Sequence, residues 1–354
     1  MAAHLWPVAR SRRARLVAAG ATALATLLLP ASAQAHGTAV VNALDFEARV
    51  ASVGRDPAVM RATVIDGDRK LEVRVSGYHT VVVLGYAREP FLRFTAVGVA
   101  VNDYSPTAAA DKLARTGSAP ALTPTAPSHW SVISVSDRFA WHDHRLGPVP
   151  GRRYGTGVVA SWAIPVVVDG RQDRITGKLW HAQGPALWQW LVLFGLALLA
   201  AVALPRLGRQ RAERGAIVCA ALAGAAAELL SIGLSFGPGV SASTAWESAP
   251  TAAAVVVVAL ILFVRIPQAR QAVAGLVGLV AVFVGVGDAG VLVHGYVISG
   301  LPAAVIRAAA ATAVCAGLIA AVSVAVGHLA ESSKPSARSG RAAMSVPRGK
   351  VRSR

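Results

Sequence analysis

Two hydrophobic patterns divide this chain near residue 186. Before that point, apolar residues alternate with polar ones or form short β-branched runs separated by turn residues. After it, they form long uninterrupted runs, beginning with the 18 uncharged residues of Leu187–Leu204. A bilayer-spanning helix needs ~20 predominantly apolar residues. The pattern therefore predicts a β domain over residues 36–185, followed by a helical membrane domain over residues 186–329.

The first half is expected to contain seven to nine short strands. Asp66-Gly67-Asp68 and Asp169-Gly170 predict tight hairpin turns, because Asp-Gly readily supplies the positive φ angles that such turns require. Tyr104–Ser128 is rich in Pro, Thr, Ala and Ser, which indicates a surface excursion with one helical turn near Ala108–Ala114. Many short strands without a long helix favour an all-β sandwich of immunoglobulin-like type. The expected strands are Val40–Val50, Val59–Ile65, Leu71–Val75, Thr80–Tyr86, Phe91–Val101, Val132–Val135, Arg138–His144, Val158–Val168 and Ile175–Trp180.

The second half is expected to be a five-helix transmembrane bundle. The connections Gly237–Pro250 and Gly295–Gly300 contain no Lys or Arg, whereas Pro205–Gly215 and the tail 330–354 are basic. Cytoplasmic segments of membrane proteins carry the excess of Lys and Arg. We therefore expect a multi-pass plasma-membrane protein with the lipid bilayer as partner, an extracytoplasmic β domain and a disordered cytoplasmic tail. The expected spans are Leu187–Leu204, Ala216–Phe236, Thr251–Ile266, Ala272–Val293 and Pro302–His328.

The N-terminus has the three parts of a secretory signal peptide. Arginines lie between Arg10 and Arg15, Leu16–Leu29 is apolar, and Ala33-Gln34-Ala35 is a small-x-small cleavage site. The alternative is an uncleaved first membrane helix. Cleavage after residue 35 would make His36 the first residue of the mature protein.

Composition excludes several classes of function. The net charge of +17 could suggest nucleic acid, but residues 36–185 hold 17 basic against 13 acidic residues. Much of the excess lies instead in the signal peptide and around the spans, as the positive-inside rule expects, so we expect no nucleic-acid partner. The sequence contains no nucleotide-binding loop, CxxC or HExxH motif, and no nucleophile motif. These absences favour a role other than catalysis.

The string Trp141-His142-Asp143-His144-Arg145 is the most distinctive candidate for chemistry. Side chains alternate along a strand, so His142 and His144 are expected on one face, ~6.5–7 Å apart at their bases. Two imidazoles at that separation can share one metal ion. A mature N-terminal His36 would add an amine and a ring nitrogen, a chelate that suits Cu(II). The alternative is that His142 and His144 are surface residues beside a core tryptophan.

These features resemble two families. The signal ending in Ala35-His36-Gly37, the exported β domain with residues 141–145 and the five expected spans resemble a family of uncharacterised actinobacterial membrane proteins. His36 and the Asp143-His144 pair are also similar to periplasmic copper-binding domains of the CopC type, which start at a mature histidine. In that family the acid and the second imidazole are spaced Asp-x-His, whereas here they are adjacent. The second resemblance implies a copper ion held by His36, Asp143 and His144, and strand geometry adds His142 as a further expected ligand.

Four ionisable residues fall within the expected spans: Glu228, Asp288, His294 and Arg307. Such residues face a bundle interior or a cavity and pair with one another, because lone charges are costly in lipid. All four are expected near the outer side of the membrane, with Asp288 and His294 inside the fourth span. One interpretation is an ion pair between Arg307 and a carboxylate that holds helices together. The other is a polar vestibule that takes an ion or proton onward.

The sequence thus predicts a membrane-anchored metal-binding protein, with copper as the expected ion, that acts in metal handling or transport. The alternative is a structural module of the cell envelope, in which the sandwich binds another envelope protein and the helices anchor it.

Overall fold

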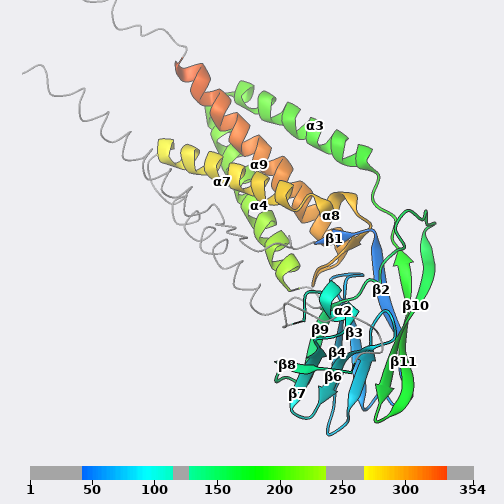
Figure 1. Cartoon of the computed structure of the whole chain (residues 1–354). Helices are drawn as coiled ribbons and strands as arrows, with labels where there is room; N and C mark the ends of the chain where they lie inside the picture. Colours follow the sequence, from blue (N-terminus) through cyan, green and yellow to red (C-terminus); the bar gives the residue numbers. More distant parts are fainter. Residues whose placement is uncertain (1–41, 115–126, 237–266, 333–354) are drawn as a thin grey trace, which may run out of the picture.

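The computed structural model describes residues 42–114, 127–236 and 267–332, which form a β-rich part and a helical part (Figure 1). The boundary lies between β11 (Arg171–His181) and α3 (Leu187–Ala203), where the sequence pattern predicts it. The predicted signal peptide, His36, the predicted span Thr251–Ile266 and the basic tail after Ser332 lie outside the described residues.

The β-rich part contains one large sheet. Its seven strands follow the order β2-β11-β10-β5-β6-β7-β8, and the strand neighbours are antiparallel. Buried residues alternate with partly or fully exposed ones over the second half of β11, as expected for a sheet with one covered face. The strand bounds are Phe46–Val53 (β2), Val81–Leu84 (β5), Pro90–Thr95 (β6), Gly98–Asn102 (β7), Trp130–Ser134 (β8), Gly157–Val168 (β10) and Arg171–His181 (β11).

A smaller sheet packs against the large one. It has the order β3-β4-β9, with β3 at Met60–Ile65, β4 at Lys70–Val75 and β9 at Arg138–His142. Residues from both sheets form one hydrophobic core, in which the aromatic rings of Phe91 and Trp141 meet edge to face with centroids 6.2 Å apart. Burial of large side chains from both sheets stabilises the domain, at roughly 1.5–3 kcal/mol for each.

Both predicted hairpin turns are confirmed. Ile65 pairs with Lys70 across a four-residue loop, residues 66–69, and Val168 pairs with Arg171 across Asp169-Gly170. The Asp-Gly residues of both turns have positive φ angles, between 48° and 80°. This is the conformation that favours Asp-Gly in tight turns.

Two predicted strands are wrong in their extent. Phe91–Val101 is a hairpin rather than one strand, because Thr95 pairs with Gly98 and β7 returns along β6. Gly98 has a φ of 129°, and a Cβ there would lie 2.3 Å from the carbonyl oxygen of Ser134. Val40–Val50 is also interrupted, since β1 (Ala43–Leu44) and β2 are separated at Asp45.

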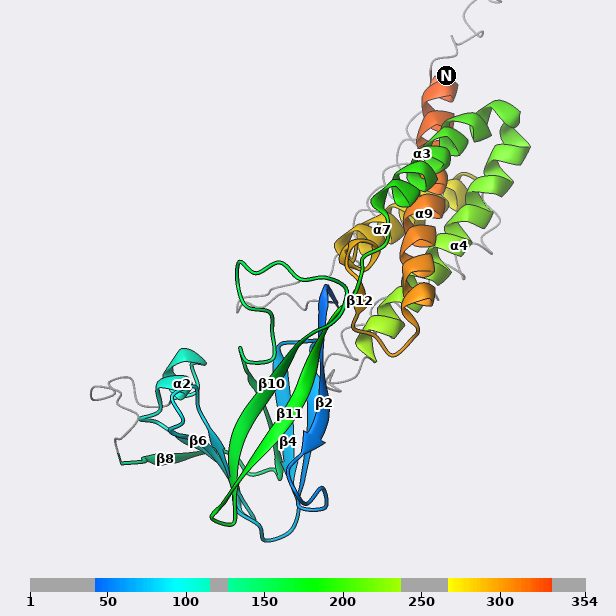
Figure 2. The same ribbon diagram turned by 90° about the vertical axis from the view of Figure 1, so that its right-hand side faces the viewer.

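The helical part contains four helices long and apolar enough to cross a membrane. This count covers residues 187–236 and 267–327, so the structure supports a membrane-associated protein without testing the fifth predicted span. The helix α9 (Ala303–Ser332) packs against α3, α4 (Arg209–Ser235) and α7 (Pro267–Gly287). Figure 2 shows these helices extending away from the β-rich part. A 3₁₀ turn, η1 (Leu204–Leu207), joins α3 to α4.

The fourth predicted span, Ala272–Val293, is too long. The helix α7 ends at Gly287, and a separate short helix α8 (Gly290–Val293) follows a turn at Asp288-Ala289. Asp288 and His294 therefore lie beyond the helix, in the connection to α9, and not inside the span. Glycine weakens a helix by ~1 kcal/mol, so the cluster of glycines at 285, 287 and 290 favours an end there.

The connection between α8 and α9 joins the two parts of the molecule. Its strand β12 (Tyr296–Val297) pairs antiparallel with β1, with Ala43 opposite Val297 and Leu44 opposite Tyr296. Trp190 of α3 donates a hydrogen bond to the carbonyl oxygen of Leu292 in α8, 2.7 Å away. These contacts attach the β-rich part to one end of the helices (Figure 1).

Candidate metal centre

The imidazoles of His142 and His144 lie together at the end of β9. Their ring centroids are 4.6 Å apart, and the rings meet at 68°. The strand ends at His142, so His144 belongs to the following turn rather than to a longer strand. The predicted proximity of the two rings is confirmed, although the strand ends two residues earlier than predicted, at His142 instead of His144.

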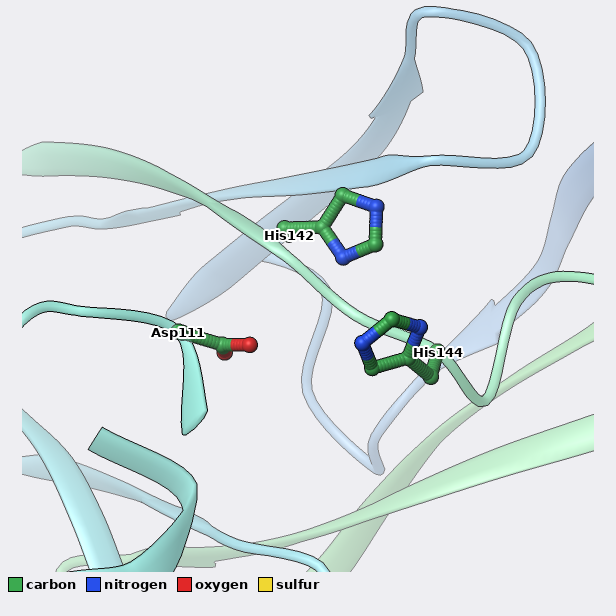
Figure 3. Close-up of side chains that lie close together, drawn as sticks. All are labelled: Asp111, His142 and His144. Carbon is green, nitrogen blue, oxygen red and sulfur yellow. The ribbon is translucent and has the colours of Figure 1, made fainter. Parts of the chain in front are cut away.

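A third donor, Asp111, comes from a different segment of the chain. One donor atom from each of Asp111, His142 and His144 lies within 4.8 Å of the other two. Figure 3 shows the carboxylate of Asp111 directed toward the two rings. Metal–nitrogen and metal–oxygen bonds of ~2.0–2.2 Å would place opposite ligands ~4 Å apart. Small side-chain movements would therefore close this group around one ion.

One oxygen of the Asp111 carboxylate lacks a hydrogen-bond partner among the described residues. This oxygen, Oδ2, is buried. Burial and the neighbouring Asp143 carboxylate raise the pKa of Asp111 to about 6. A cation beside this oxygen would favour the ionised form that burial and Asp143 disfavour.

The helix α2 (Pro106–Ala110) places Asp111. Asp111 is its C-cap residue, and Ser105 is its N-cap residue, whose hydroxyl accepts the Ala108 N–H. Oε1 of the buried Glu89 accepts hydrogen bonds from Ser105 Oγ and Thr107 Oγ1, both at 2.7 Å. Glu89 thus anchors the first turn of α2 to the large sheet, and this anchor sets the position of Asp111.

Asp143 was expected to be a ligand, but the structure gives it another role. Its two oxygens accept hydrogen bonds from Arg145 Nε at 2.9 Å and Nη2 at 2.7 Å, and Trp141 Nε1 donates to Oδ2 at 3.1 Å. The side chain is only 1% exposed, so these partners occupy it. Asp143 therefore organises the turn that carries His144, and Asp111 is the carboxylate beside the imidazoles.

Two further contacts hold the turn. The Arg145 Nη1 donates to the carbonyl oxygen of Leu84 at 3.0 Å, which ties the turn to the end of β5. The backbone N–H of His144 donates to Tyr86 Oη at 3.1 Å. Burial raises the pKa of Tyr86 to about 12, so its hydroxyl stays neutral. The pKa of His142 is lowered, first by burial and then by the neighbouring His144 and Arg69, so neutral imidazole, the form that binds metals, is favoured.

A pocket of about 450 Å³ opens beside the two imidazoles. His142 and His144 line one part of it together with Asp68 and Arg69, and the neighbouring Asp143 also reaches its wall. Asp45 and His294 line another part, and His294 comes from the connection between α8 and α9. The candidate metal centre is therefore open toward the helical part.

The interpretation in which Arg307 pairs with a carboxylate of the polar cluster, Asp288 or Glu228, is wrong, because its guanidinium binds carbonyl groups. Arg307 donates to the carbonyl oxygens of Val291 at 3.0 Å, His294 at 2.9 Å and Gly295 at 2.8 Å. It thereby satisfies the carbonyls that a short helix leaves unpaired at its C-terminus.

The other members of the predicted polar cluster have separate partners. Asp288 accepts a hydrogen bond from Asn42 Nδ2 at 2.6 Å, and His294 Nδ1 lies 3.0 Å from Asp45 Oδ1. Glu228 lies on α4, and its buried Oε2 has no hydrogen-bond partner within the described segments. Asp288, His294 and Arg307 thus gather at the connection between α7 and α9, where they contact the β-rich part or the connection itself.

Asp111 is the member of the candidate metal centre that strand patterns do not reveal. It is the only acidic residue of the predicted excursion Tyr104–Ser128, a stretch rich in Pro, Thr, Ala and Ser. A single carboxylate in such a stretch could have marked Asp111 as a candidate ligand. Its partners, however, lie more than 30 residues away in the sequence.

No protein-family model, no curated protein and no solved structure matches this chain. The geometry of the site is therefore the basis for assigning a function.

Proposed function

We propose that this protein is a membrane-anchored extracytoplasmic metal-binding protein, and that its β domain binds a transition metal, with copper as the ion. The observation that carries the proposal is the buried Oδ2 of Asp111. Within the described part of the chain it has no hydrogen-bond partner, and the carboxylate is directed toward His142 and His144. A buried charge without a partner is costly, so an ion at this point would stabilise the site.

The chemistry of the donors supports a transition metal over calcium or magnesium. Imidazole nitrogens suit copper, zinc, iron and nickel, whereas calcium and magnesium prefer a full set of oxygens. Divalent copper is the most tightly held of the first-row ions at a given nitrogen and oxygen site. Three protein donors leave coordination positions open, and the amine and ring of a mature His36 would complete a Cu(II) site. A mature His36 would match the first residue of CopC-type domains, and this match supports the same assignment.

The proposed role is binding, delivery or uptake rather than catalysis. The proposal places the β domain outside the plasma membrane, after removal of residues 1–35, and gives its two sheets an immunoglobulin-like arrangement. It includes Thr251–Ile266 as a fifth span, which places the basic tail in the cytoplasm. The apolar helices and the absence of Lys and Arg from residues 295–300 support this orientation.

A competitive Cu(II) titration of the full mature chain in lipid nanodiscs tests the metal centre. Replacing both imidazoles, His142→Ala with His144→Ala, should weaken binding by well over tenfold, because water replaces two nitrogen ligands. Asp111→Asn should weaken it by about tenfold, since the amide carries no charge and is a poorer ligand.

His129→Ala is the matched control. His129 is also paired with a carboxylate, that of Asp103 at 3.1 Å, but it lies outside the candidate group. Its replacement should leave the affinity unchanged. Equal affinity for the wild type and the double histidine variant would refute the metal centre. The envelope-interaction module would then be the better interpretation of the β domain.

A further inference from the structure

The pocket beside the metal centre has a second group of donors that the metal centre does not use. Asp45 and His294 form part of its lining and are separated by 249 positions in the sequence. Asp45 lies between β1 and β2, whereas His294 ends α8. One pocket is therefore lined by imidazoles from the β-rich part and by an imidazole from the helical part.

The pairing of His294 suits a metal ligand. Its Nδ1 lies 3.0 Å from Asp45 Oδ1, and the two side chains are 40% and 46% exposed. A metal-binding histidine commonly donates its other ring N–H to a carboxylate, which fixes the ring and makes the free nitrogen more basic. With the proton on Nδ1 and directed to Asp45, Nε2 carries the lone pair.

The backbone around His294 is held firmly. Arg307 donates to the carbonyl oxygens of His294 and Gly295, and the next residues pair with β1. Asp288 accepts a hydrogen bond from Asn42, just before β1. These contacts keep the imidazole of His294 against the β-rich part, with its ring at the pocket.

The charges of the pocket also favour a cation. Asp143 is neutralised by its ion pair with Arg145, which leaves the carboxylates of Asp45 and Asp68 against the guanidinium of Arg69. The imidazoles of His142, His144 and His294 add nitrogen donors. The lining thus offers nitrogen and oxygen ligands of the kind that copper, zinc and nickel accept.

We propose that His294 and Asp45 form a second, weaker binding position for a divalent transition metal, in the pocket that His142 and His144 of the first centre also line. This proposal rests on the proposed function for the identity of the ion. The second position is weaker because it has one imidazole instead of two. It gives the helical part a ligand of its own in the pocket of the exported domain.

The test uses the full mature chain in nanodiscs and Cu(II) alone as the probe. Binding stoichiometry is measured by equilibrium dialysis, and nitrogen coordination by electron paramagnetic resonance. The key variant is His294→Asn, in which the amide Nδ2 can still donate to Asp45 while the imidazole is lost. The matched control is His79→Asn. His79 also binds a carboxylate through Nδ1, that of Asp169 at 2.7 Å, but it does not line the pocket.

The wild type should bind one more Cu(II) than His294→Asn, and the lost event should be the weaker of two. His79→Asn should match the wild type. A melting temperature of His294→Asn equal to that of the wild type would show that the junction is intact; if it falls, Asp45→Asn replaces it as the test variant.

The two proposals fail in different ways. If His294→Asn and Asp45→Asn bind as much Cu(II) as the wild type, the second position is refuted and the first stands. If the double variant of His142 and His144 binds like the wild type while His294→Asn loses one event, the first centre is refuted and the second stands. A wild type that binds no Cu(II) overturns both.

Discussion

The carboxylate of Asp143 and the guanidinium of Arg145 form a bidentate ion pair, with Nε 2.9 Å from Oδ1 and Nη2 2.7 Å from Oδ2. The two residues flank His144, so their pairing closes the turn around it. Planar guanidinium and carboxylate groups match in this geometry, which makes such pairs stronger and more specific than single contacts. The position of the His144 imidazole therefore depends on a pair that binds no metal itself.

Asp143→Ala should lower the thermal stability of the metal-free protein. The change leaves Arg145, only 19% exposed, without its partner, and such losses cost about 3–5 kcal/mol. Thermal unfolding of the metal-free chain measures this loss. Glu47→Ala is the control, because the Arg49 side chain of its ion pair is 57% exposed and surface pairs contribute ~0–1 kcal/mol. Equal melting temperatures for the two variants would contradict the assigned role of Asp143.

The stability of the metal-free protein should change with pH because of Asp68. Burial raises the pKa of Asp68 to about 6 from its ordinary 3.8, so the folded state binds this proton more tightly than the unfolded state. The wild type therefore loses stability as the pH rises from about 4 to about 6. Asp68→Asn has no such loss. The melting temperature of the variant minus that of the wild type should increase by a few degrees over this range and stay constant above pH 7. A constant difference throughout would contradict the raised pKa.

Gly295→Ala should disrupt the junction of the two parts. A Cβ at Gly295 would lie 2.0 Å from the carbonyl oxygen of Ala182, which is backbone and cannot easily yield. Overpacking of this kind costs roughly 1–3 kcal/mol. Proteolysis between residues 182 and 187 should become faster in the variant. Gly287→Ala is the control, because nothing lies within 4 Å of a Cβ at that glycine; similar proteolysis of the two variants would argue against the close contact.

Arg307→Lys should weaken the connection that carries His294. A guanidinium can reach the carbonyls of Val291, His294 and Gly295 together, whereas an ammonium on a flexible stem cannot reproduce this fork. Amide hydrogen exchange of residues 290–297 should become faster, while exchange in β10 and β11 should not change. Unchanged exchange throughout would show that the charge alone holds this connection.

A reporter fused after Arg354 tests the proposed orientation. Four candidate spans are found in residues 187–236 and 267–327, and Thr251–Ile266 would be a fifth. With the β domain outside, five spans place the C-terminus inside, and four place it outside. We expect activity only from a reporter that works in the cytoplasm. Activity of an exported reporter would mean that the C-terminus lies outside and that Thr251–Ile266 does not cross the membrane.

Local features of this molecule followed from the sequence alone. The long apolar runs predicted the helices, and the Asp-Gly turns predicted two hairpins, because helix length and turn geometry depend on neighbouring residues. The meeting of His142 and His144 was predicted for the same reason, since the two are only two residues apart. The sequence pattern missed the turn at Ala96-Val97, where neither residue is a usual turn former.

The tertiary structure alone decided which polar groups meet. Asp111 joins the imidazoles because α2 is anchored at Glu89. Asp143 does not, because Arg145 and Trp141 already occupy both of its carboxylate oxygens. His294 meets Asp45 across 249 positions, and Arg307 binds carbonyl groups rather than a carboxylate. Distant strands and helices bring several possible partners to each polar group, and the best hydrogen-bond geometry determines which pair forms. The spacing of residues in the sequence does not predict that outcome.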